Sequence, residues 1–406
     1  MGKNIKGEEI GKGFTQRKDG RYQARIYYEG KEITLYGYDL EVLRREVYNK
    51  ENEVKEGFEI HSQNITLDEW VNECTTLYSL NKKNTSLLTE ECNYNRIKPY
   101  LGYYRLKSIR MSHVQKAINQ LYTSGYAYST IVSSKNFLYS RMQLAIQNKI
   151  ISKNPCIGVV LPVNDTKEVQ PLTKQEQQKF FNAIYGQRYY SLFKLLLETG
   201  MRIGEACALQ WKDIDFEHRL IYVTKTLNRT KQYNRRNEKI NDKRYRINVT
   251  TPKKDASNRV IPMSDNAVLA LKSWEIIQES DKSRMGAKWG KNNYLSDNYP
   301  DMVFTTSTGN PLPPSDAWKY CTQGVNRINE EEVLTAMIQN REPCLLTLHP
   351  HIFRHTFATE CMNQGMNPKV LMKILGHTNM QMLNRYTHAN IDIIVEEFNR
   401  CRVKTV

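Results

Sequence analysis

One segment near the C-terminal end of the chain carries side chains that suit chemistry on a phosphate. LHPHIFRHTFATECMNQG, residues 348–365, contains His351 and Arg354, which share one face of a helix at a spacing of three residues. An imidazole beside a guanidinium is unfavourable unless an anion lies between them, so this pair fits phosphoryl transfer. In that chemistry His351 would move a proton and Arg354 would bind an oxygen.

Another cation, Arg202, lies in ETGMRIGEACALQWKDID, residues 198–215. We expect Gly200 to end one helix and Gly204 to lie in the opening of the next. Arg202 would then stand beside a helix start, where free N–H groups favour an anion. Glu205 follows three residues later, within reach to orient the guanidinium. The segment predicts a phosphate-binding Arg202, although a surface Arg–Glu pair is the commoner meaning of such a segment alone.

A tyrosine follows in LMKILGHTNMQMLNRYTHAN. The pattern indicates a short helix ended by Gly376, with His377 directly after it. Tyr386 comes nine residues after His377 and is one of 25 tyrosines, so a core or surface role is the default. Its hydroxyl has an unperturbed pKa of about 10, and would need a base and a cationic site to act as a nucleophile.

A lysine that could act as an acid lies in TPKKDASNRVIPM, residues 251–263, which indicates a β-hairpin with its turn at residues 255–257. A lysine on a hairpin arm can reach into a site. Because successive strand residues point to opposite faces, only one of Lys253 and Lys254 should do so. Ordinary solvated charge is the alternative for either.

The histidines allow a rival interpretation. Five of the eight lie between residues 349 and 388, and the HxHxxxH pattern of His349, His351 and His355 could ligate zinc. No nearby Cys or Asp supplies a convincing fourth ligand, and Arg354 would repel a cation. We therefore expect no metal.

Charge points to the class of partner. The net charge of +16 suggests a polyanion, either nucleic acid or an acidic membrane surface. The segment 225–259 holds twelve Lys and Arg against three acids, a net +9, although a solvated basic loop without a target would look the same. The chain contains no apolar run of about 18 residues, so no transmembrane helix is expected. No secretory signal is expected either. The eight cysteines form no CxxC pair and indicate free thiols in a reducing cytoplasm.

The elements that would position these residues fall into three parts. Residues 1–60 show strand patterns followed by a helix, with Arg17, Lys18, Arg21 and Arg25 interleaved with aromatics, and such a sheet face could read a DNA groove. Residues 65–156 carry only helical patterns: Thr66 and Glu69 form a capping box, and Ser112 and Ser129 are expected N-caps. Residues 170–406 are mixed, with strands expected at 219–224, 245–250 and 258–262 and helices after about 314.

Together the chemical residues resemble those of the tyrosine recombinase (phage integrase) family. The resemblance covers roughly residues 173–390 and follows the family's order R…K…HxxR…H…Y. In this chain the matching positions are Arg202, Lys253, His351, Arg354, His377 and Tyr386.

The resemblance implies a reaction. Tyr386 would attack a DNA phosphodiester and form a 3′-phosphotyrosine, freeing a 5′-hydroxyl. Arg202 and Arg354 would stabilise the charged transition state, and Lys253 would protonate the leaving 5′-oxygen.

The remaining matched residues would assist. His351 would be the general base or acid at the tyrosine, His377 would hydrogen-bond the phosphate, and Glu205 would support Arg202. Because the covalent intermediate retains the bond energy, no ATP, metal or other cofactor is required.

The resemblance also implies a multidomain α+β architecture. An arm-type DNA-binding domain with a three-stranded sheet and a helix would span 1–60, as in integrases of Gram-positive phages and conjugative transposons. An all-helical core-binding domain would span 65–156. A mainly helical catalytic domain with a β-hairpin sheet and a C-terminal tail would span 170–406.

One departure from the family concerns its hairpin, which is often short. Here 28 residues, 226–253, lie between the first strand and the lysine and carry most of the basic cluster. We expect this insertion to be an extended hairpin or loop that contacts DNA phosphates, with Arg235, Arg236, Lys243 and Arg244 among its contacts.

The implied function is a site-specific recombinase that integrates and excises a prophage or conjugative transposon. Its implied partners are double-stranded DNA at core and arm sites, an excisionase, a host DNA-bending protein and, through the apolar tail 391–398, three further copies in a tetramer. The implied location is the cytoplasm of a bacterium, on the nucleoid and away from membranes. The sequence leaves open whether the tail packs within its own subunit or on a neighbour.

Three other functions use parts of the same evidence. A catalytically silent DNA-binding regulator is disfavoured by the complete set of catalytic residues. A type IB topoisomerase-like enzyme would share the chemistry but needs no arm-type domain. A metal-dependent nuclease is the least expected of the three, and activity that survives in EDTA would exclude it.

Overall fold

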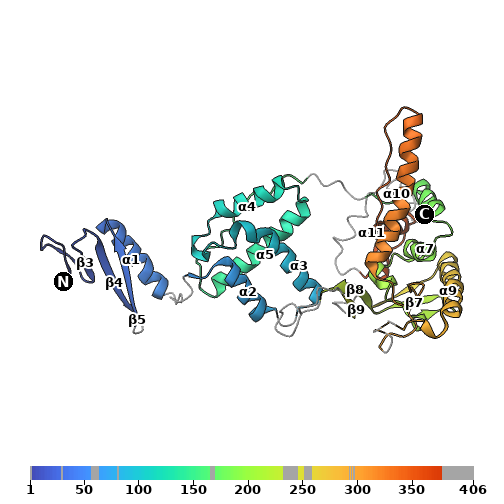
Figure 1. Ribbon diagram of the computed structural model, residues 1–406, viewed down its shortest axis with the longest axis horizontal. Coiled ribbons are helices and arrows are strands. Elements are labelled where there is room, and N and C mark those ends of the chain that lie inside the picture. The colour runs from blue at the N-terminus through green and yellow to red at the C-terminus, as the bar shows by residue number, and fades with distance from the viewer. Residues whose placement is uncertain are drawn as a thin grey trace, which may run out of the picture. The chain divides into compact units, whose positions relative to one another are not determined.

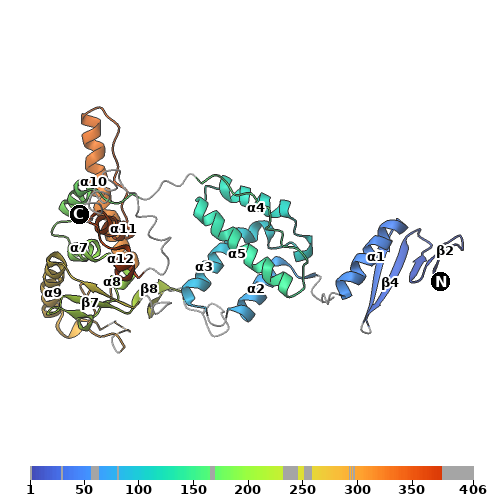
Figure 2. The same cartoon turned by 180° about the vertical axis from the view of Figure 1, so that it is seen from behind.

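The computed structural model of the 406-residue chain describes residues 2–28, 31–55, 64–79, 82–164, 170–231, 246–250, 258–291, 293, 295 and 298–376. The chain divides into two compact units, whose described parts are residues 2–164 and 170–376. The first unit contains an N-terminal module and a helical domain, and the second contains helices and small sheets (Figures 1 and 2).

The N-terminal module is a small sheet with one helix. Strands β3 (Phe14–Gln16), β4 (Tyr22–Tyr28) and β5 (Lys31–Gly37) form an antiparallel sheet in the order β3-β4-β5, and helix α1 (Leu40–Lys55) packs on β4 and β5. Ala24 and Ile26 are buried, as is Leu43 of α1, whereas Arg25 and Tyr27 are exposed. This confirms the predicted sheet and helix. A further pair, β1 (Gly2–Lys3) and β2 (Glu9–Gly11), was not predicted.

The helical domain confirms the all-helical prediction for this part of the chain. Its elements are α2 (Leu67–Tyr78), α3 (Asn84–Leu101), the 3-10 helix η2 (Leu106–Ser108), α4 (Met111–Thr123) and α5 (Tyr128–Gln147). They share one core that includes Trp70, Leu101, Ile118 and Met142.

Two of the three predicted helix starts in this domain are wrong. The capping box is present: Thr66 Oγ1 accepts from the Glu69 N–H at 3.3 Å, and Glu69 Oε2 accepts from the Thr66 N–H at 2.8 Å. Ser112 and Ser129, however, lie inside the first turns of α4 and α5, because each helix begins one residue earlier. At α4 the ring nitrogen Nδ1 of His113 accepts from the Arg110 N–H at 3.2 Å, so the helix has a cap without serine.

The second unit is mainly helical. Its helices are α6 (Lys174–Ala183), α7 (Tyr190–Thr199), α8 (Ile203–Ala206), η3 (Trp211–Asp213), α9 (Asp265–Met285), η5 (Gly286–Lys288), α10 (Pro314–Ile338), α11 (Pro350–Asn363) and α12 (Pro368–Leu375). Helix α7 packs against α9 and α11 in a core whose rings include Phe180, Phe193, Phe353 and Trp274.

The small sheets of this unit bear on the predicted hairpin. Strands β6 (Ile214–Asp215), β7 (Leu220–Val223) and β10 (Arg259–Pro262) form one sheet, and β8 (Thr226–Thr230) pairs with β9 (Arg246–Thr250) in another. The first arm and the turn of the predicted hairpin over 251–263 lie outside the described residues. Its second arm, β10, pairs with β7, and β9 belongs to the other sheet. Ile261 of β10 lies opposite Ile221 of β7 and both are fully buried, so core packing takes β10 to β7.

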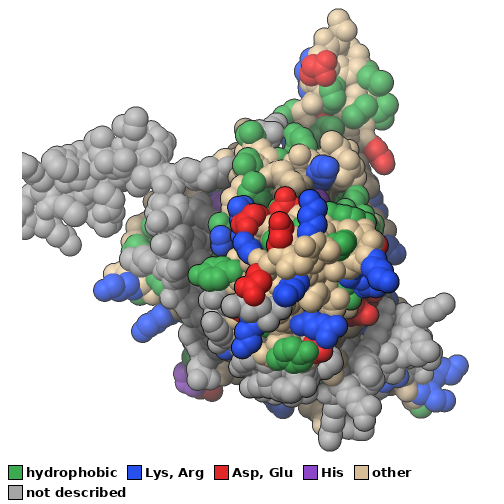
Figure 3. Space-filling model, turned by 90° about the vertical axis from the view of Figure 1, so that its left-hand side faces the viewer, with side chains coloured by type: hydrophobic (Ala, Val, Ile, Leu, Met, Phe, Trp, Pro, Cys, Tyr) green, Lys and Arg blue, Asp and Glu red, His purple; other side chains and the backbone are tan. Residues whose placement is uncertain are grey.

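The C-terminal end of helix α10 projects beyond the other helices of the second unit (Figures 1 and 2). Leu334, Met337 and Ile338 are exposed on this end, where Figure 3 shows hydrophobic side chains. The segment that follows α10 is held against this helix, because Glu332 accepts hydrogen bonds from the Arg341 side chain and the Cys344 N–H. None of the helices in the described ranges is long and apolar enough to cross a membrane.

Candidate active site

The turn between α7 and α8 positions Arg202. Gly200 ends α7 with a left-handed φ of 61°, and a Cβ there would lie 2.4 Å from a ring carbon of Phe357, so only glycine fits. Arg202 is the N-cap of α8, as predicted, and its N–H and Nη1 donate to Glu205 Oε2 and Oε1, each at 2.9 Å. Its side chain is 35 % exposed, which leaves the guanidinium accessible to a ligand.

Helix α11 carries His351 and Arg354. It begins with Pro350 at its first position, as predicted. The Arg354 side chain is 1 % exposed and donates from Nη1 to the Gly200 carbonyl at 2.8 Å and from Nη2 to the Leu375 carbonyl. One guanidinium thereby joins three segments: α11, the turn that carries Arg202, and the end of α12.

The neighbouring charges act on His351. Its side chain reaches the surface, but its ring is sufficiently desolvated to lower its pKa, and the positive charges of Arg354 and Arg202 lower the pKa further. The negative charge of Glu205 raises the pKa of His351, but this effect is smaller. Arg354 also binds the carbonyl of Gly200, two residues before Arg202, and Arg202 binds Glu205, so the structure brings these groups and His351 into one site. At neutral pH His351 is an uncharged imidazole beside two arginines.

Arg259 of β10 belongs to the same cluster, and the sequence interpretation missed it by counting it only within the basic segment. Its Nη1 and Nη2 donate to Glu205 Oε1 and Oε2 at 3.0 and 2.7 Å, and its Nε donates to the Ile374 carbonyl. A signal was available: Arg259 alternates with exposed Val260 and shares the inward face of its strand with Ile261. A buried arginine needs a carboxylate partner.

The end of α12 leads to the other matched residues. Gly376 closes the helix in the left-handed conformation, as predicted, one residue before His377. His377, Tyr386 and Lys253 lie outside the described residues, as do Arg235, Arg236, Lys243 and Arg244 of the insertion.

The described histidines near the site do not gather as a zinc site would require. His349 stacks on Trp318 with ring centres 5.2 Å apart, and His355 Nδ1 lies 3.3 Å from the Thr359 hydroxyl. Over the part of the chain that the structure describes, no three His, Cys, Asp or Glu side chains form a group that could hold a metal ion.

Comparison with known proteins decides the family. Residues 170–392 match the model of the phage integrase family, and residues 66–122 match that of the phage integrase N-terminal SAM-like domain. The chain belongs to the phage integrase family. It is a tyrosine-type site-specific recombinase, an enzyme that cleaves and rejoins DNA.

The recombinase is similar to transposon proteins and to a XerC-like recombinase. It is 28 % identical to the transposase of transposon Tn916 from Enterococcus faecalis, over 97 % of this chain and 95 % of that protein. It is 30 % identical to a tyrosine recombinase XerC-like protein of Caldanaerobacter subterraneus, over 83 % of each chain. The solved structure of the Tn1549 transposon integrase with a circular intermediate DNA is 29 % identical, covers 83 % of this chain and 99 % of that one, and superposes with a TM-score of 0.68.

The N-terminal module gives the recombinase a basic, aromatic sheet face. The guanidinium carbons of Arg17 and Arg21 lie 5.6 and 5.9 Å from the ring centre of exposed Tyr36, and Arg25 is exposed on the neighbouring strand. Lys18 is exposed in the turn between β3 and β4. Acids partly offset these charges: Asp19 pairs with Arg21 at 2.6 Å and Glu32 with Arg25 at 3.4 Å.

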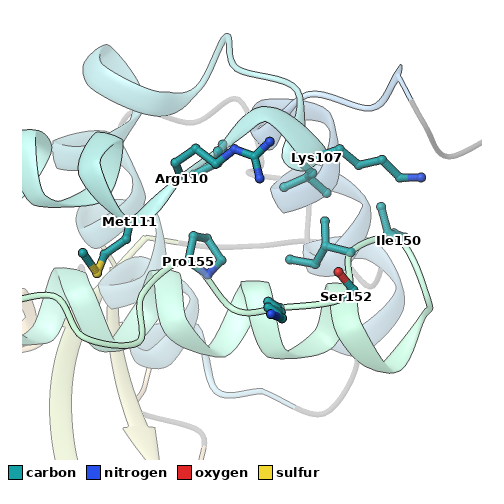
Figure 4. Close-up of a pocket in the computed structure, with 10 residues that line it drawn as sticks. Lys107, Arg110, Met111, Ile150, Ser152 and Pro155 are labelled. Carbon is teal, nitrogen blue, oxygen red and sulfur yellow. The ribbon is translucent and has the colours of Figure 1, made fainter. Parts of the chain in front are cut away.

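The helical domain contains a basic hollow that the sequence interpretation did not find. It has a volume of about 350 Å³ and lies between the start of α4 and the chain after α5. Figure 4 shows Lys107 and Arg110 along one side of it and Ser152 on the other. Lys153 also lines it, so three cations border a hollow whose positive charge favours an anionic group.

Proposed function

We propose that this recombinase is the integrase of a conjugative transposon, and that it excises and integrates the element through a 3′-phosphotyrosine. The observation that carries the proposal is the assembly of Arg202, His351 and Arg354 beside the end of α12. Ten residues beyond Gly376 the chain reaches Tyr386. Similarity to Tn916 transposase over nearly the whole chain, N-terminal module included, supports the choice of element.

The proposed reaction uses the groups in a definite order. The Tyr386 oxygen attacks the phosphorus and loses its proton to His351, the 5′-oxygen leaves with a proton from Lys253, and His377 hydrogen-bonds the phosphate. Arg202 and Arg354 stabilise the added negative charge. Two backbone carbonyls hold the Arg354 guanidinium in place beforehand, so little reorganisation is needed as charge develops.

DNA binding is proposed to use three basic surfaces. Residues 1–60 would bind arm sites through the face around Tyr36, residues 65–156 would bind core sites through the hollow at Lys107 and Arg110, and the insertion after β8 would contact phosphates. A tetramer joined by the C-terminal tail, an excisionase and a host DNA-bending protein would complete the assembly. A solved relative, λ integrase, forms a tetramer on a Holliday junction.

A suicide substrate tests the proposed function. DNA carrying a transposon-end core site with a nick beside the cleavage position should trap the recombinase covalently, and peptide mapping should place the phosphodiester on Tyr386. The adduct should form equally in EDTA. Failure to form any adduct on cognate ends, with DNA binding intact, would favour a silent DNA-binding protein instead.

The pH dependence of cleavage should report His351. In the free protein the pKa of His351 lies below the usual 6.5. The neutral, proton-accepting form of His351 therefore predominates at pH 6.5 and above. We expect kcat/KM for cleavage to stay level from pH 8 to about 6.5 and to fall below it. His351→Asn should be about 10²–10⁴-fold slower and should lack this acidic limb. An unchanged limb in the variant would show that another group titrates.

The insertion should contribute to affinity through charge. Replacing residues 231–245 with Asn-Gly would keep β8 and β9 joined by a tight turn and remove six Lys and Arg together with two acids. We expect weaker DNA binding and a shallower dependence of log K on log salt, by about 0.9 for each phosphate that the insertion neutralises. Binding measured by fluorescence anisotropy from 50 to 200 mM salt tests this. A loop of equal length with its cations changed to Ser separates charge from length, and wild-type slopes in both variants would refute the role.

A further inference from the structure

Arg259 makes contacts to both parts of the site at once. Its side chain is only 4 % exposed. Two of its nitrogens hold the Glu205 carboxylate in a fork at 3.0 and 2.7 Å, and the third holds the Ile374 carbonyl at the end of α12. Gly376 packs directly on this side chain, since a Cβ there would lie 3.2 Å from Arg259 Cδ.

The carboxylate between the two arginines is shared. Glu205 accepts from Arg259 with both oxygens, and from Arg202 through its N–H and Nη1. Burial by itself would raise the pKa of Glu205, but the hydrogen bonds and charge of Arg259, with the charge of Arg202, lower it to about 2. The cluster therefore holds two permanent cations around one permanent anion.

This sharing decides how much positive charge Arg202 can offer. With Arg259 present, the carboxylate is divided between two guanidiniums and Arg202 retains charge for a phosphate. Without Arg259, the whole carboxylate would face Arg202 from its buried position, where its charge is poorly screened. Arg202 would then be neutralised and drawn toward Glu205.

The second set of contacts concerns α12. The carbonyls of Ile374 and Leu375 form the negative end of this helix, and they point at Arg259 and Arg354 respectively. Both cations hold the last turn before His377. Arg259 is attached to the β10–β7 sheet, whereas Arg354 is attached to α11, so the turn is held from two sides.

We propose that Arg259 is a positioning residue for DNA cleavage. It acts through Glu205 to keep Arg202 oriented and charged, and through the Ile374 carbonyl to fix the point from which the chain continues to His377 and Tyr386. It holds these groups and leaves contact with the phosphate to Arg202 and Arg354. The inference rests on the proposed role of Arg202 in cleavage.

Cleavage at saturating DNA is the primary test. Arg259→Met should reduce the single-turnover rate on a suicide substrate by about 10², because a misplacement of about 1 Å can cost that much, while Kd for DNA changes by less than about threefold. Arg259→Lys keeps the charge but lacks the planar fork, so it should still lose about tenfold. Arg188→Met is the matched control: Arg188 is a mostly buried arginine paired with Asp281 in the same unit, away from the site contacts. It should lower the melting temperature and leave cleavage by the folded protein unchanged.

A rescue experiment separates positioning from simple stabilisation. If Arg259 acts by sharing the Glu205 carboxylate, then Arg259→Met combined with Glu205→Gln should cleave faster than Arg259→Met alone, since no anion remains to neutralise Arg202. A merely structural arginine predicts the reverse, because a second buried partner is removed. The proposal would be overturned if the double variant cleaved more slowly than Arg259→Met. It would also be overturned if Arg259→Met cleaved within twofold of the wild-type rate, or no more slowly than Arg188→Met.

Hydrogen exchange provides a readout without catalysis. Amides of residues 369–376 should exchange faster in Arg259→Met than in wild type, and should be unchanged in Arg188→Met. Equal protection in all three proteins would overturn the α12 part of the proposal. If wild type itself formed no adduct, the proposed function would fail, whereas normal adducts in wild type and in Arg259→Met would refute only the role of Arg259.

Discussion

Replacing Tyr386 with phenylalanine is expected to abolish covalent protein–DNA adducts while the recombinase still binds its DNA. The change removes one oxygen, the atom that would join the phosphate, and keeps the ring. A neutral hydroxyl contributes only about 1 kcal/mol of net hydrogen bonding, so Kd for DNA should rise by no more than about fivefold. The two quantities are measured on one suicide substrate, by denaturing electrophoresis for adducts and by mobility shift for binding.

Tyr185→Phe is the matched control for this loss. Tyr185 is a 79 % exposed tyrosine of the same unit, and its variant should form adducts at the wild-type rate. Adducts that persist in Tyr386→Phe would show that another residue is the nucleophile.

Mixing Tyr386→Phe with an Arg354 variant tests in which subunit's site the tyrosine works. We expect no restored cleavage, because each tyrosine should serve its own subunit's site, and restored cleavage would show that it crosses to a neighbour.

Arg354→Lys is the second change with a large expected effect. Lysine keeps a positive charge but cannot hold the carbonyls of Gly200 and Leu375 with a planar fork. The charge that we propose to act on the phosphate then loses its fixed position, and we expect cleavage to slow by about 10²–10³. A buried carbonyl left without a donor costs about 1–3 kcal/mol, which predicts a fall in melting temperature of roughly 2–4 °C for each kcal/mol.

The two consequences of this change can be separated. Cleavage is compared with wild type at a temperature where both proteins are folded by circular dichroism. Arg284→Lys provides the control, because Arg284 is a surface arginine on α9 that pairs with Asp281 three residues away. Its variant should match wild type in both measurements. Cleavage by Arg354→Lys within threefold of the wild-type rate would show that the Arg354 guanidinium does not stabilise the transition state.

Local chemistry explains what could be predicted from the sequence. A helix end depends on residues within about four positions, so Gly200, Gly376, Pro350 and the Thr66–Glu69 box all predicted real boundaries. The same short range brings Arg202 to Glu205. The expectations at Ser112 and Ser129 were wrong because another residue could cap α4, and serine one position too late is tolerated inside a first turn.

Long-range pairing explains what could not be predicted. Arg259 meets Glu205 across 54 residues, and Arg354 meets Gly200 across 154, so no local pattern encodes either contact. The pairing of β10 with β7 instead of β9 has the same cause: the choice depends on which surface the core leaves open to Ile261. The family order of residues identified the chemistry. The strand pattern could place Arg259 on an inward face, but only the folded structure shows that its partner is Glu205.

The sealed position of the Arg259–Glu205 pair has a practical consequence for isolating reaction intermediates. The two side chains are 4 % and 5 % exposed, so dissolved ions cannot enter between them. The basic faces at Arg17 and Arg25 are open, and at 1 M salt the Debye length is only about 3 Å. A concentrated-salt wash should therefore strip loosely held DNA from immobilised recombinase and retain only strands joined by a covalent bond. After return to low salt, an added strand with a free 5′-hydroxyl should attack the phosphotyrosine, release the tyrosine oxygen and be joined, because the wash does not disturb the ion pair that we propose to organise the centre.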